Sequence, residues 1–422
     1  MVEVAVRTAM IQLGCSLLGR LLSTQDGHSG QWVDCGSEHS AEFIGYRDKN
    51  VHTVLGPVRV RRAYYHCGAC HRGVVARDAQ LGVSEQSLSP GLRRMVARVA
   101  AVAPFAAAAD LLADPAGIGL RTKRVQRQAD ADGQAAAVAV AHQSRAILHR
   151  RVAVPPPVPL PDMLYLAIDG TGMPVVPAAA LDRAGEDGPA RTREVKLACL
   201  FTQTKLDDQG RPVRDPDTSS YLGTFAPVDQ FTTLVHAEAR RRGAEHIRQL
   251  VVLGDAAVWI WKLATTILPE ATQIVDLYHA REHPHDLAKQ LAPVLDDNQP
   301  TWLAERLANL DAGDIQTLVS ATTELPLGDA DRAKVDTALE YFKTNAQRMR
   351  YKVFRELGMF IGSGTVEAGR KTLIGQRLKL SGMRCNIPGA TGIITLRCHR
   401  ASDRFDQIWP HPHNQIPTLT AA

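Results

Sequence analysis

The stretch LYLAIDGTGMPVV, residues 164–176, decides the expected fold, because it is a strand-like apolar run interrupted by one acid, Asp169. A second run, QLVVLGDAAVWIW at residues 249–261, predicts a buried strand that ends at Asp255 and turns into a helix. The apolar residues before each acid fix which end of the strand is buried. The sequence therefore predicts two strands that bring carboxylates to one edge of a sheet.

Other apolar and β-branched runs predict the rest of this sheet. Strands are expected in residues 194–204, near residues 229–237, and within residues 271–283. Residues 286–356 instead show helical spacing, which predicts an all-helical insertion. GSGTVEAGRKTLIGQRLKL, residues 362–380, then predicts a helix with Glu367 near its first turn. This order of elements indicates the α/β class with a mixed sheet.

A proline-rich stretch, VAVPPPVPLP, separates this region from what precedes it and predicts an extended linker. The expected organisation is an N-terminal helix (1–26), a region with a cysteine pair and a hairpin (27–80), a helical region (81–151), the linker (152–161), the first part of the α/β core (162–285), the insertion (286–356), the last part of the core (357–403) and a tail (404–422). The last residues of the tail, PHPHNQIPTLTAA, are expected to be unpacked.

Composition excludes several classes of protein. The chain has 422 residues, of which 45% are hydrophobic and 22% charged, so it is neither disordered, collagenous nor a disulfide-stapled miniprotein. Its net charge of +5 is unevenly distributed: residues 1–160 carry +7, residues 161–349 carry −9 and residues 350–400 carry +8. Two basic zones on either side of an acidic one suit a protein that holds phosphates with the former and cations with the latter.

The opening residues hold an apolar run without a basic start or a small-residue cleavage site. No stretch is expected to reach the roughly 18 apolar residues of a membrane span, so a cytoplasmic protein is predicted. Seven cysteines are an odd count for a disulfide framework, and free thiols or metal ligands are favoured.

Asp169, Asp255 and Glu367 are the candidate catalytic residues. Carboxylate oxygens are the ligands that Mg²⁺ prefers, and three of them meeting at one sheet edge would suit two-metal phosphoryl transfer. The alternative is structural: the two aspartates cap turns, and Glu367 pairs with Lys371 one helical turn later. Asp276 and His279, in the DLYH element, are auxiliary candidates that orient a phosphate or a metal-bound water, or that hydrogen-bond across a loop.

Cysteine and histidine ligands flank a predicted β-hairpin, residues 42–66, which turns at Gly56 and Pro57. Ligand pairs at both ends of a hairpin are typical of a zinc ribbon with a closed structural site. The predicted ligands are Cys35, His39, Cys67 and Cys70. His66 and His71 flank the CxxC pair and are alternatives to His39.

Residues 104–131 predict a helix, a break and a second helix opened by Thr122, which is compatible with a helix-turn-helix or with an ordinary helical hairpin. Basic residues of these zones are the candidate DNA contacts. They are Arg59, Arg61, Arg62, Lys123, Arg124, Arg127, Arg370, Lys371, Arg377, Lys379 and Arg384.

Several of these motifs together resemble one known family. AIDGTGMPVV, LGDAAVWIW, IVDLYHAREH, GSGTVEAGRKTLIGQRLKLSGMR and TVLGPVRVRRAYYHCGAC resemble the ISKra group of bacterial insertion-sequence transposases, over nearly the whole chain from Cys35 to His399. The resemblance implies an RNase H-like core in which Asp169, Asp255 and Glu367 form a DDE triad. It also implies that DLYH is the acid-x-x-His signature of transposases with a helical insertion. The sequence departs from the family at Cys385, where tryptophan is usual.

The leading hypothesis is a DNA transposase that binds terminal inverted repeats through its N-terminal region and cleaves and joins strands with two Mg²⁺ or Mn²⁺ ions, beside a structural zinc. A homodimer or higher oligomer on double-stranded DNA, in the bacterial nucleoid and away from membranes, is expected by analogy. Two alternatives stay open: a catalytically silent DNA-binding protein derived from such an enzyme, and a metal-dependent structure-specific nuclease.

Overall fold

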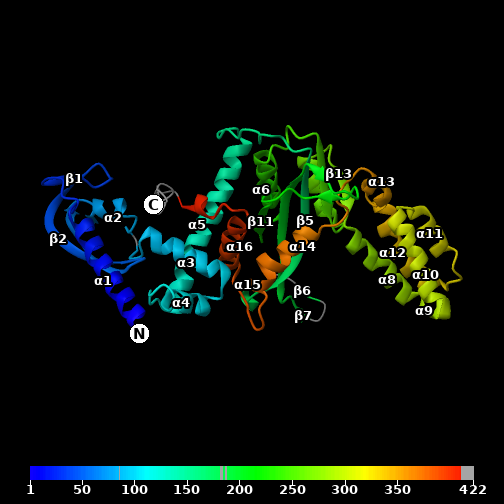
Figure 1. Cartoon of the computed structure of the whole chain (residues 1–422), viewed down its shortest axis with the longest axis horizontal. Coiled ribbons are helices and arrows are strands. Elements are labelled where there is room, and N and C mark those ends of the chain that lie inside the picture. The colour runs from blue at the N-terminus through cyan, green and yellow to red at the C-terminus, as the bar shows by residue number, and fades with distance from the viewer. Residues whose placement is uncertain (85, 181–183, 186–187, 410–422) are drawn as a thin grey trace. The chain divides into compact units, whose positions relative to one another are not determined.

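The computed structural model describes residues 1–84, 86–180, 184–185 and 188–409 (Figure 1). The chain divides into two compact units, Met1–Gln134 and Ala135–Ala422. The long helix α5 (Thr122–Leu148) begins in the first unit and ends in the second.

The first unit is built on an antiparallel sheet with strand order β1-β2-β3-β4. Its elements are α1 (Val2–Ser23), β1 (Trp32–Asp34), β2 (Ser40–Thr53), β3 (Gly56–Cys67), β4 (Arg72–Val74), α2 (Ala76–Gln80), α3 (Pro90–Val102), α4 (Phe105–Ala113) and the start of α5. The predicted hairpin is confirmed: β2 and β3 pair antiparallel from Glu42↔His66 to Thr53↔Gly56. Helices α4 and α5 occupy the segment predicted to form a helical hairpin.

Helix α1 packs along β3. Val51, Val58 and Val60 of the hairpin form a small core with Val83, and Cys15, Leu18 and Leu22 of α1 pack against it. By length and composition α1 could span a membrane, so the expectation that no stretch is long and apolar enough was wrong. One apolar face of α1 is nevertheless used within this unit, against the hairpin.

The second unit holds a larger sheet and most of the helices. Its strands are β5 (Met163–Pro174), β6 (Ala184–Gly185), β7 (Gly188–Pro189), β8 (Thr192–Gln203), β9 (Lys205–Leu206), β10 (Pro212–Val213), β11 (Ser220–Thr224), β12 (Gln249–Gly254) and β13 (Thr272–Val275). Its helices are α6 (Val228–Arg241), α7 (Val258–Ile267), α8 (Leu277–Gln290), α9 (Ala292–Leu295), α10 (Gln299–Ala312), α11 (Ile315–Thr323), α12 (Asp329–Asn345), α13 (Tyr351–Glu356), α14 (Gly364–Gly369), α15 (Gln376–Leu378) and α16 (Ile387–Ala401). Short 3₁₀ turns cover Pro177–Ala179, Asp296–Asn298, Ala346–Arg348 and Phe405–Ile408, and a π-helical turn, η4 (Arg370–Gly375), follows α14.

The larger sheet is mixed, which confirms the predicted α/β class. Its strand order is β11-β8-β5-β12-β13. Strand β8 runs antiparallel to both β5 and β11, whereas β12 runs parallel to both β5 and β13. Strands β5 and β12 are interior strands of this order, and their apolar side chains, such as Leu164, Leu166 and Val252, are buried.

Helices cover both faces of this sheet. The side chain of Leu197 on β8 packs against Gly369 in α14, 3.5 Å from where a Cβ would be. The ammonium of the neighbouring Lys196 lies 5.9 Å from the ring of Trp259 on α7. Because successive side chains of a strand point to opposite faces, α14 and α7 lie on opposite faces. Asp169 is the register partner of Leu197 and therefore belongs to the α14 face.

The strand predicted near residues 229–237 is a helix. These residues lie in α6, where Phe231, Val235 and Ala239 are buried at helical spacing after Pro227. The threonines and the valine of this segment favour a strand, which is why one was predicted. Burial of one face of a helix against the sheet outweighs that local preference. The third strand of the sheet is instead β11, five residues long.

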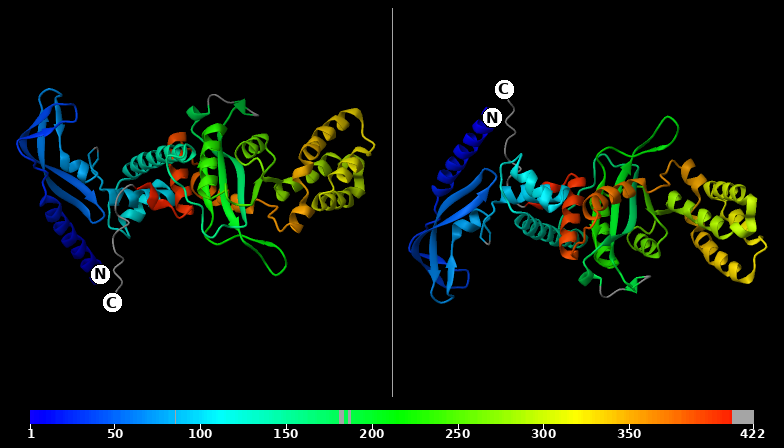
Figure 2. Two further views of the ribbon diagram at one scale, coloured as in Figure 1. Left: turned by 90° about the horizontal axis from the view of Figure 1, so that it is seen from above. Right: turned by 90° about the horizontal axis from the view of Figure 1, so that it is seen from below.

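The helical insertion starts earlier than predicted, since β13 ends at Val275 and α8 begins at Leu277. In both views of Figure 2 the insertion helices, coloured yellow, form a group of their own beside the sheet. Residues 152–161 contain neither helix nor strand. Of the predicted tail, Phe405 is buried, and residues 410–422 lie outside the described part of the chain.

Replacing Gly369 with Ala should destabilise the second unit. A Cβ there would lie 2.7 Å from the ring of Tyr221 on β11, so α14 must move away from the sheet. We expect a loss of about 1–3 kcal/mol in the free energy of unfolding, measured by urea titration. Gly364→Ala is the matched control, because no atom lies within 4 Å of its would-be Cβ. Equal stability of the two variants would contradict the close packing of α14.

Candidate metal centres and nucleic-acid interface

Three acids come to one row across the central strands. Strand β12 pairs with β5 up to Leu253↔Ala167 and with β13 up to Gly254↔Val275. The same registers, continued past the last pairs, put Asp255 beside Asp169 and beside Asp276. Side chains at one level of neighbouring parallel strands point to the same face, so these acids share the α14 side of the sheet.

Asp169 is buried at 7% exposure. Burial raises the pKa of its carboxyl, and the negative charge of Asp255 raises it further, while Arg370, and His279 when protonated, act in the opposite direction. Burial and the neighbouring acid thus both disfavour the charged form of Asp169. Such a group needs a cation beside it to stay ionised.

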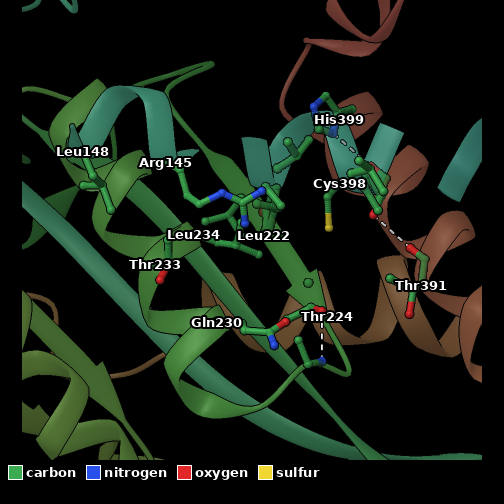
Figure 3. Close-up of a pocket in the computed structure, with 18 of the residues that line it drawn as sticks. Arg145, Leu148, Leu222, Thr224, Gln230, Thr233, Leu234, Thr391, Cys398 and His399 are labelled. Carbon is green, nitrogen blue, oxygen red and sulfur yellow. Dashed lines mark hydrogen bonds between the residues drawn. The ribbon is translucent and has the colours of Figure 1, made fainter. Parts of the chain in front are cut away.

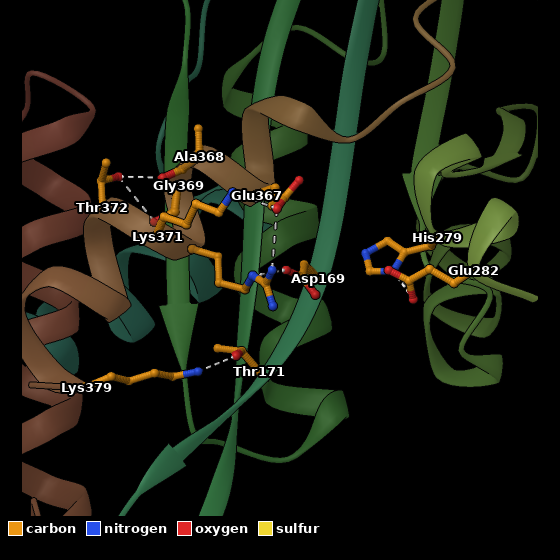
Figure 4. Close-up of polar contacts among 11 residues, drawn as sticks. Asp169, Thr171, His279, Glu282, Glu367, Ala368, Gly369, Lys371, Thr372 and Lys379 are labelled. Carbon is orange, nitrogen blue, oxygen red and sulfur yellow. Dashed lines mark hydrogen bonds and ion pairs between the residues drawn. The ribbon is translucent and has the colours of Figure 1, made fainter. Parts of the chain in front are cut away.

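Glu367 approaches the same face from α14, where it lies in the first turn as predicted. Its carboxylate is half-exposed and forms an ion pair with the ammonium of Lys371 at 2.9 Å. The hydrogen bond from Lys371 lowers the pKa of Glu367. Figure 4 shows Glu367 and Lys371 above Asp169, on the helix that crosses the sheet.

Arg370 lies between the two acids. Its Nε is 3.2 Å from an oxygen of Asp169, and its second nitrogen is 3.7 Å from an oxygen of Glu367. The buried Nε makes no hydrogen bond of good geometry with any described residue, so its contact with Asp169 is an ion pair only. Arg370 therefore neutralises the acids without being tightly held by them.

The three carboxylates do not form a compact ligand shell. Within the described residues, the cysteine and histidine cluster discussed below is the one group of three or more such ligand atoms that all lie within 4.8 Å of one another. Asp169, Asp255 and Glu367 do not meet this spacing, and their expected convergence on a single pocket stays a prediction. The guanidinium of Arg370 lies at ion-pair distance from two of them, Asp169 and Glu367.

Asp276 is a positioning residue. It caps α8 by accepting a hydrogen bond from the backbone N–H of His279 at 3.0 Å. Its other oxygen accepts one from the backbone N–H of Ser363, just before α14. The backbone N–H of Leu277 also donates to the carbonyl of Ile361 at 3.0 Å. Asp276 thereby ties the start of the Glu367 helix to the sheet, which is the structural alternative for this residue.

His279 projects from the first turn of α8 toward the acids (Figure 4). When protonated, His279 lowers the pKa values of both Asp169 and Glu367. Its Nδ1 also lies 3.8 Å from Glu282 on the same helix. His279 therefore faces the acid site, unlike Asp276, whose oxygens are both engaged by backbone groups.

The predicted zinc ligands meet in the first unit. Cys35, His39, Cys67 and Cys70 place their ligand atoms within 4.8 Å of one another. The Sγ atom of Cys70 lies 3.6 Å from that of Cys35 and 3.1 Å from the Nδ1 of His39. Three thiols and one imidazole suit a tetrahedral metal such as zinc. The fourth member of this cluster is thus His39 rather than His66 or His71.

Local structure explains this selection. His66 and Cys67 are neighbours on β3, so they point to opposite faces and only one of them can face the cluster. The backbone N–H of Cys70 donates to the Sγ of Cys67 at 3.4 Å and lowers the pKa of that thiol. A lowered pKa favours the thiolate, which is the form that binds a metal. The cluster adjoins a small core of Ala41, Ala63 and Tyr65.

Most of the predicted basic contacts lie at the surface. Arg59 and Arg61 alternate with buried valines on β3 and face outward, and Lys123 and Arg127 are exposed on α5. Lys371 and Arg384 are also exposed. Lys379 donates to the hydroxyl of Thr171 at 2.7 Å, on the same strand as Asp169 (Figure 4).

Three of these assignments do not fit the structure. Arg62 is 9% exposed and pairs with Asp78, because it shares the inward face of β3 with Val58 and Val60. Arg377 is 1% exposed. Arg124 is half-buried and donates to the hydroxyl of Ser87 at 2.7 Å. These side chains stabilise the fold rather than offering charge to a phosphate backbone.

A separate cavity of about 700 Å³ lies among α5, α6, β11 and α16 (Figure 3). Its described lining is mainly apolar, with Leu148, Leu222 and Leu234 beside Arg145, and it includes no carboxylate. It is therefore no candidate for a cation site.

Sequence reasoning missed the role of Arg370 as the counter-ion of the acids. Its place one helical turn after Glu367 was the available signal, since residues three apart on a helix share a face. The link from Lys379 to Thr171 joins residues far apart in the chain and left no such signal.

The sequence matches no protein-family model. No curated protein matches it either. Among solved structures, the Drosophila P element transposase strand transfer complex is similar at 11% identity, over 79% of this chain and 82% of that chain, with a TM-score of 0.25. A score of this size does not establish a common fold.

Replacing Cys67 with Ser should remove the metal from the first unit. We expect roughly one equivalent of zinc per chain in the native protein and none in Cys67→Ser, because a closed structural site needs all four ligands. Metal content by mass spectrometry, with limited proteolysis of the hairpin, measures this. Cys385→Ser, in the second unit, should keep the zinc. Full zinc content in Cys67→Ser would refute the assignment.

Proposed function

We propose that this chain is a DNA transposase, of the ISKra type that its motifs resemble, and that Asp169, Asp255 and Glu367 are its DDE triad. The observation that supports this most is the nearness of Asp169 on β5 to Asp255, which directly follows the adjacent parallel strand β12, with Glu367 linked to Asp169 through Arg370. Acids on the two central strands and on a helix crossing them suit metal-dependent phosphoryl transfer.

The sheet supports an RNase H-like core. Its order, β11-β8-β5-β12-β13, combines an antiparallel meander of three strands with two further parallel strands. This is the arrangement that the resemblance leads us to expect. The insertion of α8 to α13 between the second and third acids agrees with the same expectation.

The donors fit a hard divalent cation. Asp169, Asp255 and Glu367 offer oxygen atoms only, which is the set that Mg²⁺ and Mn²⁺ prefer. Among the described residues, Arg370 is the one cationic side chain at ion-pair distance from the buried Asp169. A divalent cation could take the place of its guanidinium. When bound, two such ions would supply an activated hydroxyl and stabilise the leaving oxygen.

Basic side chains next to the acids would hold the DNA. Arg370, once displaced from Asp169, could pair with a phosphate beside the scissile bond, because a guanidinium binds phosphate with two parallel hydrogen bonds. Lys371 and Lys379 flank it on the same stretch of chain. His279 faces the acids from the opposite side and could orient a phosphate oxygen or a proton.

The first unit would recognise the ends of the element. Exposed Arg59 and Arg61 on β3 and Lys123 and Arg127 on α5 suit contacts to the backbone of double-stranded DNA. The zinc cluster would hold the hairpin in shape, because the core beside it is small. A dimer or higher oligomer working on DNA in the bacterial cytoplasm belongs to this proposal.

A catalytically silent DNA-binding protein is the second candidate. The ion pair between Arg370 and Asp169 favours it, because an arginine that stayed in place would neutralise the acids as a metal ion does but could not activate a water molecule. A nuclease of the same fold would cleave DNA but would not join a 3′-hydroxyl end to a target duplex. An assay that supplies a 3′-hydroxyl end and a target duplex distinguishes the two, because only a transposase would join them.

Conservative substitution of the triad should abolish strand cleavage. We expect Asp169→Asn, Asp255→Asn and Glu367→Gln each to lower the cleavage rate at least about a thousandfold in Mg²⁺, because each removes a charged ligand. The measurement is nick mapping on a duplex that carries the element's own ends. Glu282→Gln is the control. Cleavage near the native rate, with end binding intact, would rule out the triad.

Replacing Arg370 with Ala should strengthen binding of a divalent cation. Removing a positive charge about 3 Å from Asp169 should lower the dissociation constant for Mn²⁺ about tenfold, measured by the loss of the free-Mn²⁺ paramagnetic resonance signal. Arg370→Lys keeps the charge and should change affinity little. Unchanged Mn²⁺ affinity in Arg370→Ala, or no Mn²⁺ binding by either protein, would favour the silent DNA-binding candidate.

A further inference from the structure

Helix α1 carries a second apolar face that nothing in the described chain covers. Its members are Val6, Met10, Leu13, Leu17 and Leu21. The first four follow one another at steps of four, three and four residues along the helix, and Leu21 lies one turn after Leu17, beside their line. Each of these side chains is between 57% and 63% exposed. We refer to the five residues as the α1 seam.

The α1 seam is distinct from the face that packs on the hairpin. The hairpin side consists of half-buried residues, among them Cys15, Leu18 and Leu22. This side packs closely on the hairpin. A Cβ added at Gly14 would lie 3.2 Å from the side chain of Leu55, and one added at Gly19 would lie 3.2 Å from the side chain of Val58. The exposed face is therefore not a poorly packed part of the hairpin interface. It points away from it.

The first four residues of the α1 seam, Val6 to Leu17, have the spacing of a coiled coil. Apolar residues at alternating steps of four and three form the stripe that a second helix with the same pattern can cover, knobs into holes. A second copy of this chain carries that pattern. The helix is already fixed on the hairpin, so pairing would not have to bear the cost of forming a short free helix.

Charge complementarity selects the direction of the pair. Glu3 stands on the line of the seam at one end and Arg20 at the other, both exposed. In an antiparallel pair centred between Met10 and Leu13, Met10 of one copy faces Leu13 of the other and Val6 faces Leu17. The same register sets Glu3 against Arg20 at both ends. A parallel pair would instead place like charges together.

We propose that α1 is the self-association site of this protein, and that two copies pair antiparallel through the α1 seam with Glu3 of each copy against Arg20 of the other. The proposal assigns a surface to the dimer that belongs to the proposed function, and it does not depend on the acid site. A lipid bilayer is the other partner that an apolar helix can have. It is disfavoured because α1 is clasped by the hairpin on one side and carries Arg7 and Arg20 within its length.

Introducing acids into the seam tests the site. The native full-length chain should sediment as a dimer at micromolar concentration without DNA, and the variant Met10→Asp/Leu13→Asp should sediment as a monomer, with a dissociation constant at least a hundredfold higher. Gln12→Asp/Ser16→Asp is the matched control, because it adds the same charges to the same turns on the polar side. A monomeric native protein, or a seam variant that stays dimeric, overturns the proposal.

Charge exchange tests the direction. Glu3→Arg alone and Arg20→Glu alone should each weaken the dimer several-fold, and the double variant Glu3→Arg/Arg20→Glu should restore it, since the pairs reform with reversed sign. Failure of the double variant to restore the dimer overturns the antiparallel arrangement. Native protein that cosediments with neutral phosphatidylcholine vesicles through the seam, instead of dimerising, would assign α1 to a membrane and overturn the site.

Discussion

The parallel register between β5 and β12 is the constraint on which the acid site depends. It sets Asp169 and Asp255 side by side at the centre of the sheet, where burial raises the pKa of Asp169 and makes its charge costly. A shift of one residue would turn one of these side chains to the other face. Everything else at the site, including Arg370, Glu367 and the tether from Asp276 to Ser363, arranges cations and donors around that fixed pair.

Charge compensation links the fold to its proposed chemistry. Arg370 follows Glu367 by one turn and enters a π-helical segment, so the same short stretch supplies a carboxylate and the cation that neutralises its neighbour. The arginine keeps the acids compatible with folding when no metal is bound, and its ion pair lacks the geometry of a hydrogen bond. Binding of a metal would then be an exchange of cations, and the freed guanidinium would stand next to a phosphate.

Sequence patterns predicted what is local and missed what depends on packing. Alternation predicted the hairpin and CxxC spacing predicted the cysteine cluster, because each needs only a few neighbouring residues. Composition gave the wrong structure for Phe231 to Ala237, where burial on one side makes a helix of a β-rich segment. The number of basic residues in this zone led to the prediction that Arg62 contacts DNA, and that prediction does not fit. Side chains alternate between the two faces of a strand, so Arg62 points inward with Val58 and Val60. The ion pairs of Arg370 with Asp169 and Glu367 could not be predicted, since the one with Asp169 depends on how the segment after α14 packs over the sheet.

The most direct measurement is an anomalous-scattering map from a crystal of the full chain soaked in Mn²⁺. The account predicts a peak bounded by Asp169, Asp255 and Glu367, with the guanidinium of Arg370 withdrawn from Asp169. A map without density there at saturating Mn²⁺, with the Arg370 ion pair intact, would contradict the claim that these acids form a metal-dependent catalytic site.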